Sequence, residues 1–172
     1  LGFWSKVEEG TIPTRVTHND TKINNILFDR QGEVLCAIDL DTVMNSTSLN
    51  DFGDAIRSYA NTGDEDDRDL SRVGLSLEMF RAYTEGYLSQ RAKQLTDSEI
   101  DHLAFSARYI TFEQVLRFLM DYIDGDTYYK VKYPGHNLVR THAQYRLLQS
   151  MEEHYGEMCR IVRETVDKYR KA

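Results

Sequence analysis

The residues best suited to chemistry lie near the N-terminal end of the 172-residue chain. Asp20, Asn25 and Asp39 each stand at the edge of a short apolar run. A carboxylate and an amide five residues apart can line one loop and face a common point. An aspartate at the end of a following strand can then complete an oxygen-rich site, which suits a hard cation such as Mg²⁺. The spacing therefore predicts a cation site formed by these three side chains.

Lys22 adds a positive charge beside the same point, because it follows Asp20 by two residues. A cation in that position suits a phosphoryl oxygen that gathers negative charge in a transition state. Together, the oxygen donors and the lysine indicate phosphoryl transfer.

The elements that must position these groups change character near residue 50. Before it come short β-type runs at residues 15–18, 25–28 and 33–39. A polar connection that ends in Gly32 separates the second run from the third, which is the pattern of a β-hairpin.

Beyond residue 50 the apolar side chains recur at helical spacing almost throughout. This spacing predicts a helix over residues 70–87. A capping box at residues 96–99 opens a long helix, and a last helix is expected over residues 141–166, after the Pro-Gly break at residues 134–135. The methionine and tyrosine rows on these helices are expected to be core. We therefore predict one domain that is mainly α with a small β-hairpin layer, an α+β arrangement.

Composition and charge exclude several classes of function. No apolar run approaches the ~18 residues of a membrane helix, and a formal net charge of −7 without a basic face does not fit a nucleic-acid binder. The first residues lack the basic and apolar regions of a secretion signal. We expect a cytoplasmic protein with neither membrane nor nucleic acid as a partner.

The other reactive or charged residues have simpler interpretations. Cys36 lies in an apolar run and is expected to be a reduced thiol in the core. The histidines after residue 100 lack the spacing of a zinc site. The acidic run at residues 64–69 is either a docking patch or a solvated loop before a helix, and we expect the loop.

A family resemblance rests on the run from His18 to Asn25, which reads His-Asn-Asp-Thr-Lys-Ile-Asn-Asn. It resembles the catalytic loop of protein kinases, His-Arg-Asp-x-Lys-x-x-Asn. No arginine follows the histidine, and Ile-Asp-Leu-Asp at residues 38–41 stands in place of Asp-Phe-Gly. The chain is therefore more similar to the aminoglycoside phosphotransferase and choline kinase superfamily, whose members have a protein-kinase-like fold and phosphorylate small molecules. Residues 18–25, 38–44 and 51–57 together make it most similar to the N-acetylhexosamine kinase group, and residues 111–128 are also similar to that group.

The resemblance implies a role for each group in the loop. Asp20 would accept the proton of the acceptor hydroxyl, and Lys22 would offset charge on the moving phosphoryl group. Asn25 and Asp39 would bind the Mg²⁺ that accompanies ATP. His18 could be proposed as a general base, but the family implies a packed imidazole that hydrogen-bonds to backbone and holds the loop.

Residues 51–53 spell Asp-Phe-Gly, so Asp51 is a second candidate for the metal ligand. No β-type run leads into Asp51, whereas Asp39 ends one, and we therefore favour Asp39. The segment from Asp51 is expected to begin the first large helix. In that helix, Asp54 resembles the buried family carboxylate that hydrogen-bonds the catalytic-loop backbone.

The acceptor is less well defined by the pattern. Asp41 and Thr42 are candidates for contacts to sugar hydroxyls or for support of the metal. The resemblance places Arg117 and Tyr128 at a sugar pocket, although surface or core packing would also explain them. An N-acetylhexosamine or a related sugar is the expected acceptor. Choline, homoserine and an aminoglycoside are alternative acceptors. A non-catalytic helical binding module is the alternative to an enzyme.

Two parts of an intact kinase are missing from the sequence. No Gly-rich loop cradles phosphates, and no strand carries a lysine of the Val-Ala-Ile-Lys type. In the superfamily these parts belong to an N-terminal lobe. Residues 1–172 therefore resemble the C-terminal lobe alone, with the N-terminal nucleotide-binding lobe of the same protein as a partner. The isolated chain is expected to bind ATP weakly and to transfer no phosphoryl group.

Overall fold

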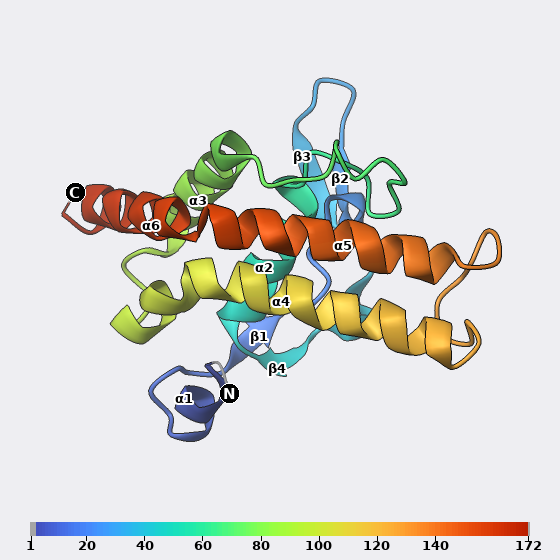
Figure 1. Ribbon diagram of the computed structural model, residues 1–172. Helices are drawn as coiled ribbons and strands as arrows, with labels where there is room; N and C mark the ends of the chain where they lie inside the picture. Colours follow the sequence, from blue (N-terminus) through green and yellow to red (C-terminus); the bar gives the residue numbers. More distant parts are fainter. Residues whose placement is uncertain (1–2, 172) are drawn as a thin grey trace.

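The computed structural model describes residues 3–171 and places most of them in helices (Figure 1). The helices are α1 (Trp4–Glu8), α2 (Ser48–Tyr59), α3 (Leu77–Arg91), α4 (Asp97–Ile123), α5 (His136–Glu153) and α6 (Tyr155–Arg170). The strands are β1 (Arg15–Thr17), β2 (Ile26–Phe28), β3 (Val34–Ala37) and β4 (Met44–Ser46), with 3₁₀ turns at Ile23–Asn25 and Leu40–Thr42. The predicted class, mainly α with a small β layer, is confirmed. Within residues 3–171, no helix is both long and apolar enough to cross a membrane.

The strands form two small antiparallel sheets. β2 pairs with β3 in the predicted hairpin, with Ile26 opposite Ala37. β1 pairs with β4, with Arg15 opposite Ser46 and Thr17 opposite Met44. This second pairing joins segments that are distant in the sequence. It therefore closes residues 18–43, which hold most of the predicted chemistry, into one loop with paired ends.

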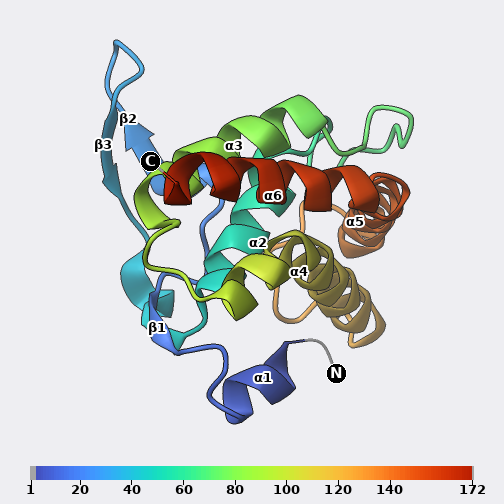
Figure 2. The same ribbon diagram turned by 90° about the vertical axis from the view of Figure 1, so that its left-hand side faces the viewer.

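The β2–β3 hairpin extends away from the helices in both views (Figures 1 and 2). Every residue of β3 is exposed, including Cys36. The prediction of a core position for Cys36 is therefore wrong. Its apolar run belongs to a hairpin that the described part of the chain does not cover, so apolar neighbours in sequence do not bury it.

The core lies around α2, which is in the middle of the helices (Figure 2) and contacts both α3 and α4. Phe52 of α2 is fully buried and meets the ring of Phe80 edge-on at 6.3 Å. Gly53 faces the neighbouring helix, and a Cβ at this position would lie 2.6 Å from the carbonyl oxygen of Ser106 in α4. The absence of a side chain at Gly53 therefore allows the two backbones to approach closely.

Two helix boundaries differ from the predicted ones. The helix expected from Leu70 begins at Leu77: residues 70–72 form a turn and a bend, Leu75 forms a β-bridge with Asn61, and Ser76 caps the helix. The last helical region starts at His136 rather than near residue 141, and a break at His154 divides it into α5 and α6. The capping box at residues 96–99 is confirmed at the start of α4.

Glu99 connects three elements in the interior. Its carboxylate accepts hydrogen bonds from Arg15 Nε of β1 at 2.7 Å, from Ser48 Oγ of α2 at 2.7 Å and from the backbone N–H of Thr96 at 2.8 Å. Burial by itself would raise the pKa of Glu99, but these hydrogen bonds outweigh it and lower the pKa to about 2. The carboxylate therefore holds β1 against the helices in its charged form.

The close approach at Gly53 can be tested by adding one methyl group. Gly53→Ala should lower the free energy of unfolding by about 1–3 kcal/mol, because the methyl must push α2 and α4 apart. Gly86→Ala is the matched control, since a Cβ there meets nothing within 4 Å. It should raise the stability by about 0.5–1 kcal/mol through helix propensity. Urea unfolding measures both, and equal effects of the two variants would contradict the close packing.

The stability of the fold should depend on the ionisation of Glu99. Its pKa of about 2 lies below the ordinary 4.5, so the unfolded chain binds the proton more tightly. The contribution of Glu99 is therefore complete above about pH 5 and is lost as the pH falls toward 2, by on the order of 3 kcal/mol. Urea midpoints between pH 7 and pH 2.5 measure this loss. Glu99→Gln should be less stable at pH 7 and should lose less stability on acidification; a decline parallel to that of the unchanged protein would contradict this assignment.

Candidate functional site

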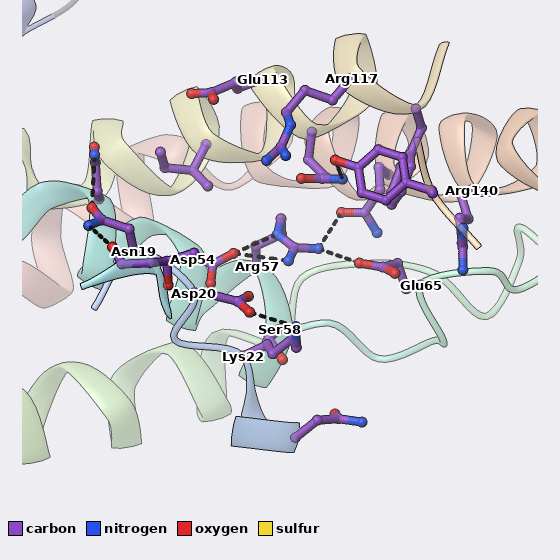
Figure 3. Close-up of a pocket in the computed structure, with 18 of the residues that line it drawn as sticks. Asn19, Asp20, Lys22, Asp54, Arg57, Ser58, Glu65, Glu113, Arg117 and Arg140 are labelled. Atoms are coloured by element: carbon purple, nitrogen blue, oxygen red, sulfur yellow. Dashed lines mark hydrogen bonds and ion pairs between the residues drawn. The ribbon is translucent and has the colours of Figure 1, made fainter. Parts of the chain in front are cut away.

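A cleft of about 1000 Å³ runs between the loop of residues 18–43 and helices α4 and α5 (Figure 3). The predicted site residues that line it are Asp20, Lys22, Asp39, Asp41, Thr42, Asp54, Arg117 and Tyr128. Asn25 is buried next to Asp20, and His18 lies behind the cleft surface, on the far side of the loop backbone. The structure therefore brings the predicted set together from segments that are as much as a hundred residues apart.

Asp20 is held by two side chains of its own loop. Its Oδ2 accepts from Lys22 Nζ at 2.6 Å and from Asn25 Nδ2 at 2.8 Å. Asn25 Nδ2 also donates to the backbone oxygen of Asp20 at 2.9 Å, so the Asn25 amide oxygen is left as the accepting end of that side chain. Burial lowers the pKa of Lys22, but the hydrogen bond and charge of Asp20 outweigh it and the pKa is raised. Lys22 is therefore a fixed positive charge at this point.

The backbone of the loop is held by Asp51, in the first turn of α2. Its two carboxylate oxygens accept from the backbone N–H of His18 at 3.1 Å and of Asn19 at 2.8 Å. Burial raises the pKa of Asp51, against the opposing effect of these amides. The sequence predicts Asp54 for this contact, and that prediction is wrong. Asp51 contacts the loop backbone from the first turn of α2, whereas Asp54, one turn later, lines the cleft.

His18 connects the two halves of the loop. Its Nε2 lies 2.9 Å from the backbone oxygen of Ile38, and its own backbone oxygen accepts from Thr42 Oγ1 at 2.6 Å. A carbonyl oxygen can only accept, so Nε2 carries the proton. The imidazole therefore hydrogen-bonds to the backbone of the segment that leads into Asp39. This is the structural role that the family resemblance implies for His18.

Asp39 directly precedes the 3₁₀ turn Leu40–Thr42 and lies in the left-handed region, with φ 64°. Within residues 3–171, no three His, Cys, Asp or Glu side chains form a metal-binding group by themselves. The amide oxygen of Asn25 and the carboxylate of Asp39 are nevertheless of the type that Mg²⁺ prefers. A Mg²⁺ ion held by this pair would take its other oxygens from water and from substrate phosphates, as this ion usually does.

Arg57 lies in the middle of the cleft wall and is a residue that the sequence did not reveal (Figure 3). Its guanidinium pairs with Asp54 at 2.9 Å and with Glu65 at 2.8 Å, and its Nη1 donates to Gln144 Oε1 at 3.3 Å. Burial lowers the pKa of Arg57, but the charges of Asp54 and Glu65 outweigh it and the pKa is raised. Asp54 and Arg57 are three residues apart, about one helical turn, so the sequence alone could have indicated the ion pair between them. Sequence spacing gives no signal for Glu65 or Gln144.

The acidic run at residues 64–69 is a loop, as predicted, but it is not simply solvated. Asp66 accepts from His136 Nε2 at 2.8 Å and from Lys132 Nζ at 3.0 Å, and Asp67 is buried. The hydrogen bonds from His136 and Lys132 lower the pKa of Asp66 to about 2. Because His136 opens α5, this contact attaches the loop to the far wall of the cleft.

Arg117 and Tyr128 lie on the α4 side of the cleft rather than in the core. The Arg117 guanidinium lies 5.9 Å from the ring centre of Tyr128 and 5.5 Å from that of Tyr129. Asp121 accepts from the backbone N–H of Tyr128 at 2.7 Å and of Tyr129 at 3.0 Å. This carboxylate therefore fixes the turn that presents both rings.

One comparison with known proteins bears on this site. The family model described as the phosphotransferase enzyme family (APH) matches residues 4–89, which is half of the chain. The matched region contains the loop of residues 18–43 and α2, whereas Arg117, Tyr128 and helices α4 to α6 lie beyond it. The superfamily predicted from the loop is thereby confirmed. The chain belongs to the phosphotransferase enzyme family.

Proposed function

We propose that the full-length protein transfers the γ-phosphoryl group of ATP to a hydroxyl of a neutral sugar, with an N-acetylhexosamine as the leading candidate. The observation that carries this proposal is the geometry of Asp20. Lys22 and Asn25 both occupy its Oδ2, which leaves Oδ1 to receive a proton from a hydroxyl in the cleft.

In this mechanism the chain acts mainly by positioning and by electrostatics. Asp20 Oδ1 orients the acceptor hydroxyl and takes its proton as the oxygen attacks phosphorus. Lys22 offsets the negative charge that gathers on the phosphoryl oxygens. Asn25 and Asp39 would hold Mg²⁺, which neutralises phosphate charge when it is bound.

Carboxylates outnumber cations in the lining of the cleft as a whole, but two arginines of its wall favour a neutral acceptor at their own position. Lys22 and Arg57 are paired with carboxylates. Arg117 and Arg140 also line the cleft, and in the described part of the chain neither forms an ion pair. Choline or an aminoglycoside lying against this wall would meet like charge, whereas a sugar would meet hydrogen-bond donors. Asp41 and Thr42 lie at the opposite side, where they can contact sugar hydroxyls or support the metal.

The second wall of the nucleotide site belongs, in this proposal, to an N-terminal lobe outside the 172 residues. The exposed apolar side chains of the hairpin and the turn after it support this assignment. They include Leu27 (43% exposed), Val34 (64%), Leu35 (63%) and Leu40 (60%). A group of exposed large apolar side chains on one hairpin is typical of a surface that another part of the protein covers. Because ATP is the phosphoryl donor, the reaction is assigned to the cytoplasm.

A panel of acceptors on the full-length protein tests the proposed function. The panel comprises N-acetylated and free hexosamines, neutral hexoses, choline, homoserine and an aminoglycoside, each with Mg-ATP in a coupled assay for ADP. Faster turnover of an N-acetylhexosamine or another neutral sugar supports the proposal. Preference for an amino alcohol overturns the choice of acceptor, and no turnover of any member favours a non-catalytic binding module.

Asp20→Asn in the full-length protein should lower kcat by ~10²–10⁴-fold, because the acceptor hydroxyl loses its proton acceptor. ATP affinity should be nearly unchanged, since Asn25 and Asp39 remain. Steady-state kinetics and a nucleotide titration measure the two effects. Asp101→Asn, an exposed carboxylate on α4, is the matched control and should retain its rate. An Asp20→Asn variant with more than about a tenth of the original kcat would be incompatible with a general base.

Asp39→Asn should raise the Mg²⁺ concentration needed for half-maximal rate by about 10-fold or more, because the negative charge of a proposed metal ligand is lost. Asparagine also tolerates a positive φ, so the backbone is kept. Asp51→Asn should lower the melting temperature and leave the Mg²⁺ requirement unchanged, since both Asp51 oxygens already accept backbone N–H groups. The reverse pattern would show that Asp51 is the metal ligand.

A further inference from the structure

Gln144 of α5 is a cleft residue with an unused hydrogen-bond donor. Its side chain lines the cleft, yet the residue is only 1% exposed. Its Oε1 accepts from Arg57 Nη1 at 3.3 Å, while its Nε2 has no partner among the described residues. Buried side-chain amides are normally paired at both ends, so this nitrogen requires an explanation.

The orientation of the Gln144 amide follows from its neighbour. A guanidinium group can only donate, and Arg57 is held in place by Asp54 and Glu65. The oxygen of Gln144 must therefore face Arg57, because a flipped amide would set two donors against each other. The –NH₂ group is consequently the end that remains for another molecule.

A second unpaired donor lies one helical turn away on the same face of α5. Arg140 also lines the cleft, and its Nη1 donates to the backbone oxygen of Lys130 and to Asn137 Oδ1. These two bonds hold the guanidinium, but its Nε is buried and has no partner within residues 3–171. Residues four apart on a helix are neighbours, so the two free donors belong to one stretch of the cleft wall.

We propose that Gln144 determines acceptor specificity by donating a hydrogen bond from Nε2 to an oxygen of the sugar other than the reacting hydroxyl, with Arg140 Nε as a neighbouring donor. This inference rests on the proposed function and deepens it. The acceptor it selects is uncharged and carries an oxygen that can accept at this wall. A sugar that lacks this oxygen leaves a buried donor unpaired, and sites of this kind reject such analogues strongly.

Gln144→Glu is the most informative variant. It keeps the shape of the side chain and the oxygen that faces Arg57, and it replaces the donor with a carboxylate oxygen, which also adds a negative charge. In the full-length protein, the acceptor KM should rise about 10-fold or more, whereas kcat should change less than about threefold and the KM for ATP should be unchanged. A residue that merely supports Arg57 would not produce this pattern, because glutamate preserves the support.

Monodeoxy and deacylated analogues of the best acceptor identify the recognised oxygen. The unchanged protein should prefer the parent sugar over one analogue by about 10-fold or more, and Gln144→Glu should reduce this preference to less than about threefold. Asn61→Asp controls for the added charge. Asn61 also lines the cleft, and an aspartate there keeps the acceptor for the backbone N–H of Gly63. This control should retain the preference for the parent sugar.

The outcomes separate the two proposals. If the protein phosphorylates a sugar but Gln144→Glu leaves both the acceptor KM and the analogue preference unchanged, the inference about Gln144 is wrong and the proposed function stands. The same conclusion follows if Asn61→Asp removes the preference equally. If the unchanged protein phosphorylates no acceptor, the proposed function is wrong and the inference falls with it.

Discussion

The bond between the Asp51 carboxylate and two backbone amides is the contact on which the site depends. It ties the N–H groups of His18 and Asn19 to the first turn of α2, the most deeply packed helix. Asn19 itself has a φ of 62°, in the left-handed region that asparagine tolerates better than most residues. With the backbone held here, Asp20 and Asn25 are presented in one orientation. The β1–β4 pairing then limits how far the rest of the loop can move.

The two walls of the cleft are built by different means. The wall that contains Asp20 and Asp39 comes from one closed loop, so local hydrogen bonds arrange most of it. The opposite wall is assembled from α2, the acidic loop, α4 and α5, and its geometry depends on helix packing such as the close approach at Gly53. Arg57 joins parts of this second wall, because it is paired within α2 and also reaches Gln144 of α5.

The features predicted correctly from sequence are those that depend on near neighbours. The spacing of Asp20 and Asn25, the hairpin and the capping box at Glu99 each involve residues a few positions apart. The incorrect predictions concern contacts that depend on how distant elements pack against each other. Asp51 and Asp54 lie one turn apart on the same side of α2, so which of them meets the loop depends on how α2 packs against the loop and not on sequence spacing.

Other contacts of the site are not indicated by any spacing in the sequence. Arg57 and Gln144 are 87 residues apart, and only the packing of α2 and α5 brings them together. Cys36 has the neighbours of a core residue, but whether a hairpin is covered depends on what lies beside it in space. Val73 is buried as its apolar character suggests, yet it lies outside the helix, in the irregular segment before the bridge between Asn61 and Leu75.

The burial of Arg57 also separates two regions of the cleft in their response to dissolved ions. Its side chain is 8% exposed, and that of its partner Asp54 is 10% exposed, so mobile salt hardly reaches this pair. The side chains of Lys22 and Asp20 are 38% and 26% exposed, and solution ions screen them more effectively. High ionic strength therefore weakens the electrostatic field around Lys22 and Asp20 first. The field around Arg57 and Asp54, in the middle of the cleft wall, changes much less.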